Sequence, residues 1–379
     1  MSGSSASASV DPRPRVLVVG VNWLGDAVMT TPALIRLRER FPEAHLVLLT
    51  PSKLRDLWTG HPAISGLMSV DAGESVVSVG RRLRREAFDL SLLLPNSPRT
   101  GLEAWMGGIP RRVGGAWPWR NWLLTDVVPA PCGLIRMRKR TPEEIRRLIA
   151  APVLPSGSGT RDAGIPASSH HVHHYLRLVG YLGADSSPVP PRLSVSAGEV
   201  EAVRQKFGFQ PGSQWLGINP GAEYGSAKRW PLERFAAAAA AMHARFGCGI
   251  AVFGGLADIG LAEALSAELA TAAPTIRILA GRTSLRELRA ALTLCRVVLT
   301  NDTGPMHVAA AVGVPVVVPF GSTSPELTAP GLPGESRHQL LRAGVPCAPC
   351  FLRECPVDLR CLHGISVARV VEAVTRAWH

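Results

Sequence analysis

The sequence predicts an α/β protein of two domains, each built on a parallel β-sheet with helices on both faces. Short apolar segments that fit buried strands alternate with segments whose apolar residues recur at helical spacing, through both halves of the chain. Parallel strands need crossover connections, usually helices, so this alternation favours parallel sheets. The length of 379 residues is long for one domain and comfortable for two.

The first half, residues 15–190, supplies one domain. Residues 1–14 are rich in Ser, Ala and Pro without an apolar core, which predicts a disordered tail instead of a signal peptide. Residues 151–169, rich in Pro, Gly and Ser, predict a flexible loop. We expect strands at 15–20, 45–50, 67–70, 90–94 and 111–113, and helices at 27–40, 79–88 and 170–182.

The helix expected at 170–182 begins with four histidines, at 170, 171, 173 and 174. Two histidines three or four residues apart could bind a metal. No carboxylate or Cys lies at matching spacing, so we expect a polar interdomain face here.

The second half, residues 191–365, follows a Pro-rich connector at 188–191 and repeats the alternation. We expect strands at 215–219, 249–254, 276–280, 297–301 and 315–320. The helices are expected at 197–207, 232–246, 258–271, 284–295 and 304–312, with a last one at 366–378.

Composition narrows the class of partner. A net charge of +12 and a pI near 10.1 indicate an acidic partner, which could be nucleic acid, anionic lipid or a phosphorylated substrate. A nucleic-acid binder would explain the charge, but zinc-finger and RNA-recognition signatures and aromatic–basic interleaving are missing, so we expect no nucleic acid. No apolar run approaches the roughly 20 residues that span a bilayer. We expect a cytoplasmic protein whose seven cysteines stay reduced.

The segment from Asn219 to Pro231 lies between an expected strand and an expected helix. It carries two glycines, which allow close backbone approach to a ligand, and the cations Lys228 and Arg229 beside a helix start. This arrangement could bind phosphate, or it could be an ordinary turn with solvated basic residues.

Two further segments end expected strands where open α/β sheets place their ligands. The first, Asn22-Trp23-Leu24-Gly25-Asp26, offers a carboxylate that could act in chemistry or cap the next helix. The second runs from Asn301 to His307, and Asp302 or Thr303 is the natural cap of the helix that follows.

Three glycine- or serine-containing loops and a cysteine cluster complete the candidates. Residues 253–258 suit an adenosine, with Asp258 as the nearest carboxylate, and residues 319–325 and 94–97 close two other strands. Four cysteines at C-x2-C-x4-C-x5-C spacing could hold a structural zinc or could be reduced and uncoordinated: Cys347, Cys350, Cys355 and Cys361.

The string P-G-A-E-Y-G-S-A-K-R-W-P at 220–231 resembles the nucleotide-sugar loop of bacterial ADP-heptose:lipopolysaccharide heptosyltransferases, glycosyltransferase family 9, and the heptosyltransferase II branch most. The resemblance implies the GT-B plan, in which two Rossmann-like domains face each other across a cleft. It also implies that residues 366–379 pack back at the interdomain junction. The implied donor-binding residues are Glu223, Lys228, Arg229, Asp258, Asp302, Thr303, Gly304, Pro305 and His307, and the acceptor-side residues are Asn22, Trp23, Asn96 and Ser97.

The resemblance further implies an inverting transfer of heptose from ADP-L-glycero-D-manno-heptose to the inner core of lipopolysaccharide, onto its first heptose. Asp26 would be the general base, and no cofactor would be required. A heptosyltransferase I-like enzyme, or a GT-B enzyme for a different sugar, stays open as an alternative. The basic surface would suit peripheral contact with the anionic inner face of the cytoplasmic membrane. The candidates are Arg81, Arg82, Arg84, Arg85 and the basic run at 136–140, and a solvated face is the alternative interpretation of these residues.

Overall fold

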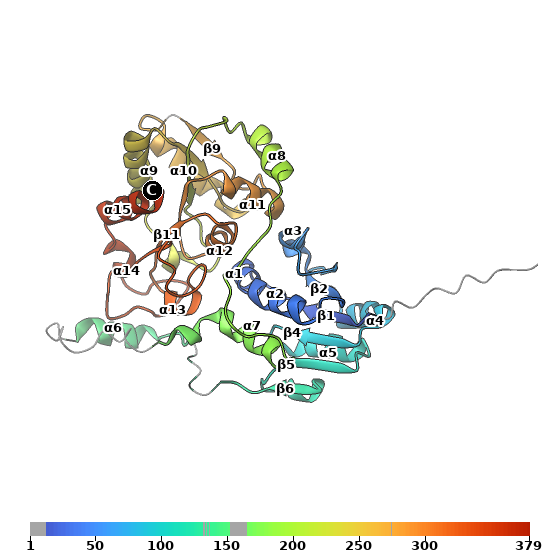
Figure 1. Cartoon of the computed structure of the whole chain (residues 1–379). Coiled ribbons are helices and arrows are strands. Elements are labelled where there is room, and N and C mark those ends of the chain that lie inside the picture. Colours follow the sequence, from blue (N-terminus) through green and yellow to red (C-terminus); the bar gives the residue numbers. More distant parts are fainter. Residues whose placement is uncertain (1–12, 132, 134, 136, 152–164, 274) are drawn as a thin grey trace, which may run out of the picture.

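The structure, a computed structural model, describes residues 13–131, 133, 135, 137–151, 165–273 and 275–379. Residues 1–12 of the tail expected at 1–14, and most of the loop expected at 151–169, lie outside the described residues. Two six-stranded sheets, parallel throughout, form two lobes (Figure 1). This confirms the predicted α/β class with two parallel sheets.

The first sheet has the strand order β3-β2-β1-β4-β5-β6. Its register aligns Val16 with Leu46 on one side and with Leu90 on the other. The strands are β1 (Arg15–Val19), β2 (His45–Pro51), β3 (Gly66–Val70), β4 (Leu90–Leu93), β5 (Arg111–Gly115) and β6 (Asp126–Val128). The helices of this half are α1 (Leu24–Met29), α2 (Thr31–Arg40), α3 (Arg55–Trp58), α4 (Val76–Glu86), α5 (Pro98–Met106), α6 (Pro142–Ala150) and α7 (His171–Gly180).

The second sheet has the order β12-β11-β10-β7-β8-β9. Its strands are β7 (Trp215–Asn219), β8 (Gly249–Val252), β9 (Ile276–Ile278), β10 (Val297–Thr300), β11 (Val316–Pro319) and β12 (Gln339–Leu341). Its helices are α8 (Ala197–Phe207), α9 (Leu232–Phe246), α10 (Ile259–Leu269), α11 (Leu285–Thr293), α12 (Gly304–Ala311), α13 (Pro325–Thr328), α14 (Arg360–His363) and α15 (Val367–Trp378).

The junction between the lobes is made by α1 and α12, which pack against each other near the centre of the molecule (Figure 1). Two glycines permit this approach. A Cβ on Gly25 would lie 2.7 Å from Cδ2 of His307, and a Cβ on Gly304 would lie 2.8 Å from Cβ of Leu24. Because one buried apolar cluster runs from β1 and α2 into α12 and β11, the lobes share a continuous core.

Two segments pack differently from what the sequence analysis led us to expect. The last helix was expected to pack back across the junction, but α15 packs on α9 and beside β10, β11 and β12, all in the second lobe. Its apolar face explains this position, since Val370, Val374 and Trp378 belong to the core of the second sheet. In addition, α6 of the first half places Ile145 against Cys347 and Cys350 of the second lobe.

Candidate active site

The loop between β7 and α9, residues 220–231, is called the donor loop below. Asn301, which follows the adjacent strand β10, holds the donor loop in place through side-chain hydrogen bonds. Its Oδ1 accepts a hydrogen bond of 2.9 Å from the backbone N–H of Trp230, and its Nδ2 donates one of 2.7 Å to the carbonyl of Pro220. The buried indole of Trp230 donates to the carbonyl of Ile365 at 3.1 Å. The loop is therefore held at the carboxyl edge of the second sheet.

Lys228 and Asp302, two of the predicted donor-side residues, form an ion pair. Nζ of Lys228 lies 2.7 Å from Oδ2 of Asp302 and 3.2 Å from its carbonyl oxygen. The side chains are 14% and 4% exposed, and the Thr323 hydroxyl also donates to Oδ2. Asp302 thus orients a cation beside the start of α12. The cap position belongs to Thr303, whose side chain makes no capping hydrogen bond.

Arg229, the second cation of the donor loop, points elsewhere. Its Nη2 donates a 3.4 Å hydrogen bond to the carbonyl of Ala222, and its Nε is buried without a partner among the described residues. Glu223 is exposed. The side-chain contacts of Arg229 therefore lie within the donor loop and do not reach the start of α12.

Asp26 lies within α1, whose cap position is occupied by Trp23, so the capping alternative is wrong for this residue. Its carboxylate faces α7. Oδ1 lies 3.6 Å from Nδ1 of His171, and the Tyr175 hydroxyl donates a hydrogen bond to the carboxylate. Burial, followed by the charge of Asp26, holds the pKa of Tyr175 well above its usual range, so Tyr175 stays protonated and remains a donor.

His307 connects the two sides of the site. Its ring is buried beside Gly25, and burial lowers its pKa to about 4. The negative charges of Asp302 and Asp26 oppose this shift, and the charge of Lys228 adds to it. The carboxylate from the first lobe and the ion pair from the second therefore act on one neutral imidazole at the junction.

Asp258, the carboxylate predicted nearest to the ribose, supports the backbone next to the donor loop. Its Oδ2 accepts a hydrogen bond of 3.0 Å from the N–H of Gly255. A Cβ on Gly221 would lie 2.3 Å from Oδ1 of Asp258, so a larger residue there would force this carboxylate to move. The carboxylate lies between the loops that follow β7 and β8.

The predicted acceptor-side residues follow β1 and β4 at the carboxyl edge of the first sheet. Asn22 and Trp23 are exposed, with Nζ of Lys53 5.4 Å from the indole centroid of Trp23. Oδ1 of Asn96 is buried without a partner among the described residues, and it would lie 3.2 Å from a Cβ on Gly115. Ser97 directly precedes α5 and makes no capping hydrogen bond.

The contacts of Asp26 with His171 and Tyr175 were not predicted. The four-histidine segment was expected to form an interdomain face, and one of its residues contacts the other lobe: Nε2 of His170 lies 3.0 Å from the carbonyl oxygen of Ala329. The sequence did contain a signal that His171 and Tyr175 lie together, because residues four apart on a helix are on the same face. His171 and Tyr175 have this spacing on α7.

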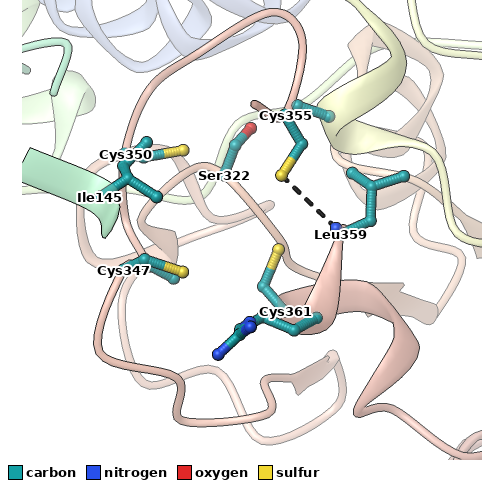
Figure 2. Close-up of a pocket in the computed structure, with 10 residues that line it drawn as sticks. Ile145, Ser322, Cys347, Cys350, Cys355, Leu359 and Cys361 are labelled. Carbon is teal, nitrogen blue, oxygen red and sulfur yellow. Dashed lines mark hydrogen bonds between the residues drawn. The ribbon is translucent and has the colours of Figure 1, made fainter. Parts of the chain in front are cut away.

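The four cysteines at 347–361 converge on one cavity, and Figure 2 shows their sulfur atoms directed into a shared space. Leu359 N–H donates to Sγ of Cys355 at 3.4 Å. Burial raises the pKa of Cys347 and Cys350, and burial with the neighbouring thiols raises that of Cys361 to about 12. Among the described residues, no three His, Cys, Asp or Glu side chains are arranged so that they could hold a metal ion. The structural zinc stays a prediction.

The cysteine segment also supports the donor loop. The N–H groups of Cys350 and Phe351 donate to the carbonyl of Ser322 at 3.0 and 2.7 Å. In turn, the Tyr224 hydroxyl donates to the carbonyl of Phe351, and the N–H of Ala227 donates to the carbonyl of Arg353, both at 2.9 Å. Residues 350–353 therefore support, through these hydrogen bonds, the segment that carries Lys228.

Comparisons with known proteins agree on one family. Residues 158–360 match the family described as Glycosyltransferase family 9 (heptosyltransferase). The chain is 30% identical to lipopolysaccharide heptosyltransferase 2 of Escherichia coli over 83% of this chain and 85% of that protein. It is 28% identical, with the same coverage, to the Salmonella typhimurium protein of that name.

The fold comparison gives the same result. The solved structure of E. coli ADP-heptose lipopolysaccharide heptosyltransferase II matches with a TM-score of 0.73 at 27% identity, covering 96% of this chain and 98% of that one. This match confirms the expected two-domain GT-B plan.

Proposed function

The chain belongs to glycosyltransferase family 9, the heptosyltransferases, and we propose that it transfers heptose from ADP-heptose to the inner core of lipopolysaccharide, onto the first heptose. The named relatives of E. coli and S. typhimurium, both lipopolysaccharide heptosyltransferases 2, support this choice of donor and acceptor. One structural observation carries the mechanism. Asp26 of one lobe and the Lys228–Asp302 pair of the other act on the same buried imidazole, His307.

In the proposed reaction, Asp26 takes the proton of the acceptor hydroxyl. The hydroxyl oxygen attacks the anomeric carbon of the heptose from the face opposite ADP. A new C–O bond forms, the bond to the β-phosphate oxygen breaks with its electron pair, and the anomeric centre inverts. The geometric support is that Asp26 lies on α1 of the first lobe, which packs against α12 of the second lobe, where the donor is expected.

Negative charge develops on the departing phosphate, and the second lobe offers it fixed positive groups. Nζ of Lys228 is preoriented by Asp302, and the backbone N–H groups of Thr303 and Gly304 lie at the start of the helix α12. Such preoriented groups are typically worth a few kcal/mol each in the transition state. We therefore propose that no divalent cation is needed for the leaving group.

The remaining predicted residues take supporting parts in this proposal. Asp258 lies between the two loops where the ribose is expected. Oδ1 of Asn96, which is buried and has no partner in the described part of the chain, is a candidate to accept a hydrogen bond from an acceptor hydroxyl. We further propose that the protein works at the cytoplasmic face of the inner membrane as a peripheral enzyme. Among the described residues, no helix is both long and apolar enough to span a bilayer.

The test is to incubate the purified protein with ADP-heptose and two core lipids, one without heptose and one with a single heptose, and to weigh the products by mass spectrometry. Addition of one heptose only to the single-heptose lipid is the expected result. Addition to the heptose-free lipid would assign the chain to heptosyltransferase I-like enzymes. No addition to either lipid would overturn the proposed reaction.

A further inference from the structure

Four tryptophans on the first lobe are exposed, although the proposed reaction does not use them. Tryptophan is usually buried over most of its surface. On α5 and in residues 116–123, however, the exposed fractions are 52% for Trp105, 40% for Trp117, 87% for Trp119 and 71% for Trp122. A surface of this kind marks a binding site for something outside the chain.

The backbone that carries Trp119 is strained in a way that holds the indole in solvent. Trp119 has φ of +64°, in the left-handed region that bulky residues rarely adopt. Its neighbour Arg120 is completely buried, donates to the carbonyl of Pro95, and has its pKa lowered to about 10 by burial. The usual placement of these residue types is reversed here, because the guanidinium of Arg120 is buried and the indole of Trp119 is exposed to solvent. Strain that persists in this way points to a functional constraint.

The exposed indoles belong to one surface that continues onto α4. Trp122 precedes Leu123, whose side chain lies 3.1 Å from a Cβ on Gly101, one turn before Trp105 on α5. The N–H of Gly108 donates to the carbonyl of Trp105, and Nε of Arg84 lies 3.5 Å from a Cβ on Gly108. The surface therefore runs from residues 117–122 over α5 to α4. The two helices α4 and α5 lie side by side (Figure 1).

The charge of this surface is positive. Arg81, Arg84 and Arg85 of α4 are exposed and form no ion pair with a described carboxylate. Three carboxylates of the same lobe are paired with other arginines: Glu74 with Arg82, Glu103 with Arg99 and Asp126 with Arg111. Tryptophan collects at the headgroup level of bilayers, and arginine is attracted to anionic headgroups. A protein partner would gain nothing from three uncompensated cations unless it were acidic, whereas an anionic bilayer satisfies both features.

The surface also begins beside the acceptor side of the proposed site. Residues 116–122 follow β5, and Oδ1 of Asn96, at the end of the neighbouring strand β4, would lie 3.2 Å from a Cβ on Gly115. This step rests on the proposed function, in which the acceptor is a lipid. A bilayer in contact with the surface would hold such a lipid near the edge of the first sheet where Asp26 lies.

We propose that Trp105, Trp117, Trp119 and Trp122, together with Arg81, Arg84 and Arg85, dock this protein onto the headgroup region of an anionic bilayer. The seven residues are called the Trp–Arg surface below. The indoles enter the interface, and the arginines lie over anionic headgroups.

The test is flotation of the full chain with phosphatidylcholine vesicles, with and without phosphatidylglycerol. The wild type is expected to float only with the anionic vesicles, and less so at high salt. The variant Arg84→Glu/Arg85→Glu should bind at least about twentyfold more weakly, since each cation near such a surface contributes roughly fivefold. Trp119→Ser/Trp122→Ser should also lose binding. The control Arg245→Glu/Arg282→Glu has the same charge change at exposed sites of the second lobe and should bind more tightly than the α4 variant.

Three results would overturn the proposal: wild-type protein that ignores anionic vesicles, α4 and Trp variants that float like the wild type, or a dimer in light scattering that Trp119→Ser/Trp122→Ser dissociates. Melting temperatures close to wild type show that the variants are folded.

Measurements of activity distinguish failure of this proposal from failure of the proposed reaction. Surface variants should transfer heptose normally to an acceptor freed of its acyl chains and poorly to one in vesicles, whereas failure of the wild type with both acceptors refutes the reaction and leaves the flotation result intact.

Discussion

Lys228 and Asp302 form an ion pair, 2.7 Å from Nζ to Oδ2, that is almost removed from solvent. Taking two charges out of water is costly, and breaking such a pair by removing one partner typically costs about 3–5 kcal/mol. The pair sits at the start of α12, where the proposed pyrophosphate would arrive. Its structural role and its donor-binding role can be separated, because only the second requires a cation.

Lys228→Met should lower stability by about 3 kcal/mol, because Asp302 is left buried and unpaired. It should also weaken ADP-heptose binding by at least about tenfold, the usual worth of a charge-assisted hydrogen bond. Adding Asp302→Asn should recover most of the stability and none of the binding. Urea unfolding and calorimetric titration measure the two effects.

The matched control for the lysine is Lys206→Met, which breaks an exposed pair with Glu287. It should change stability by less than about 1 kcal/mol and leave donor binding unaffected. If the double variant Lys228→Met/Asp302→Asn bound ADP-heptose like the wild type, Lys228 would have no part in donor recognition.

Asp26→Asn should keep a near-native melting temperature and ADP-heptose affinity while losing roughly a hundredfold or more in rate, the usual scale for a general base. Asparagine keeps the shape of the side chain but cannot take up the proton. The position is inside α1 and is not its cap, so no capping effect confuses the result. Single-turnover transfer at saturating donor measures the rate, and a folded variant with wild-type rate would remove Asp26 from the mechanism.

The sequence was sufficient to predict residues that lie at the ends of strands, and insufficient to predict their partners. Lys228 and Asp302 each follow an apolar strand, and the family resemblance assigned both to the donor side. These two residues are 74 apart in the chain, and their pairing depends on β7 lying beside β10. The contact of Asp26 with His171 and Tyr175 likewise depends on the placement of α7 next to α1.

The local sequence pattern also could not predict short edge strands or the elements against which the outer helices pack. Strands β6 and β12 have three residues each, too few for a periodic signal, and neither was predicted. The helix α15 was predicted within one residue, but not its location on the second lobe. An amphipathic pattern specifies that one face is buried and leaves open against what.

Gly25→Ala should destabilise the junction, because the new methyl group would lie 2.7 Å from Cδ2 of the buried His307 ring. Crowding of this kind typically costs about 1–3 kcal/mol, more than the roughly 1 kcal/mol that alanine gains in a helix. We also expect lower kcat/KM, since a displaced α1 carries Asp26 with it. The control Gly198→Ala on α8 has open space and should be neutral or stabilising. Equal stability of Gly25→Ala and wild type would show that the lobes adjust freely at this contact.

Stability should fall as the pH is lowered from about 7 toward 4. Burial lowers the pKa of several histidines, to about 3 for His170 and to about 4 for His61, His174, His307 and His338. The unfolded chain has ordinary values near 6.5, so between pH 6.5 and 4 it binds more protons than the native state. Each histidine then removes up to about 1.4 kcal/mol of stability per pH unit.

His170→Asn isolates one of these groups, because asparagine can still cap α7 but does not titrate. Its unfolding free energy should depend less steeply on pH than that of the wild type between pH 7 and 5, as measured by urea unfolding at each pH. A slope as steep as the wild-type slope would mean that His170 is protonated in the native state.

Metal removal tests the assignment of charges in the site. If Lys228 and the start of α12 stabilise the leaving phosphate, EDTA should leave the initial rate of transfer nearly unchanged. A strict requirement for Mg²⁺ that can be titrated back would show that the charge of the leaving group is stabilised by an ion instead.

The four-cysteine cavity requires a separate test. It borders the donor loop at Ala227, and residues 350–353 of the cysteine segment form hydrogen bonds with that loop and with Ser322. Elemental analysis of the purified protein should find about one zinc per chain if the cysteines bind it tetrahedrally. In that case Cys350→Ser should lose the ion and weaken donor binding, while Cys295→Ser, a buried thiol outside the cavity, should keep both.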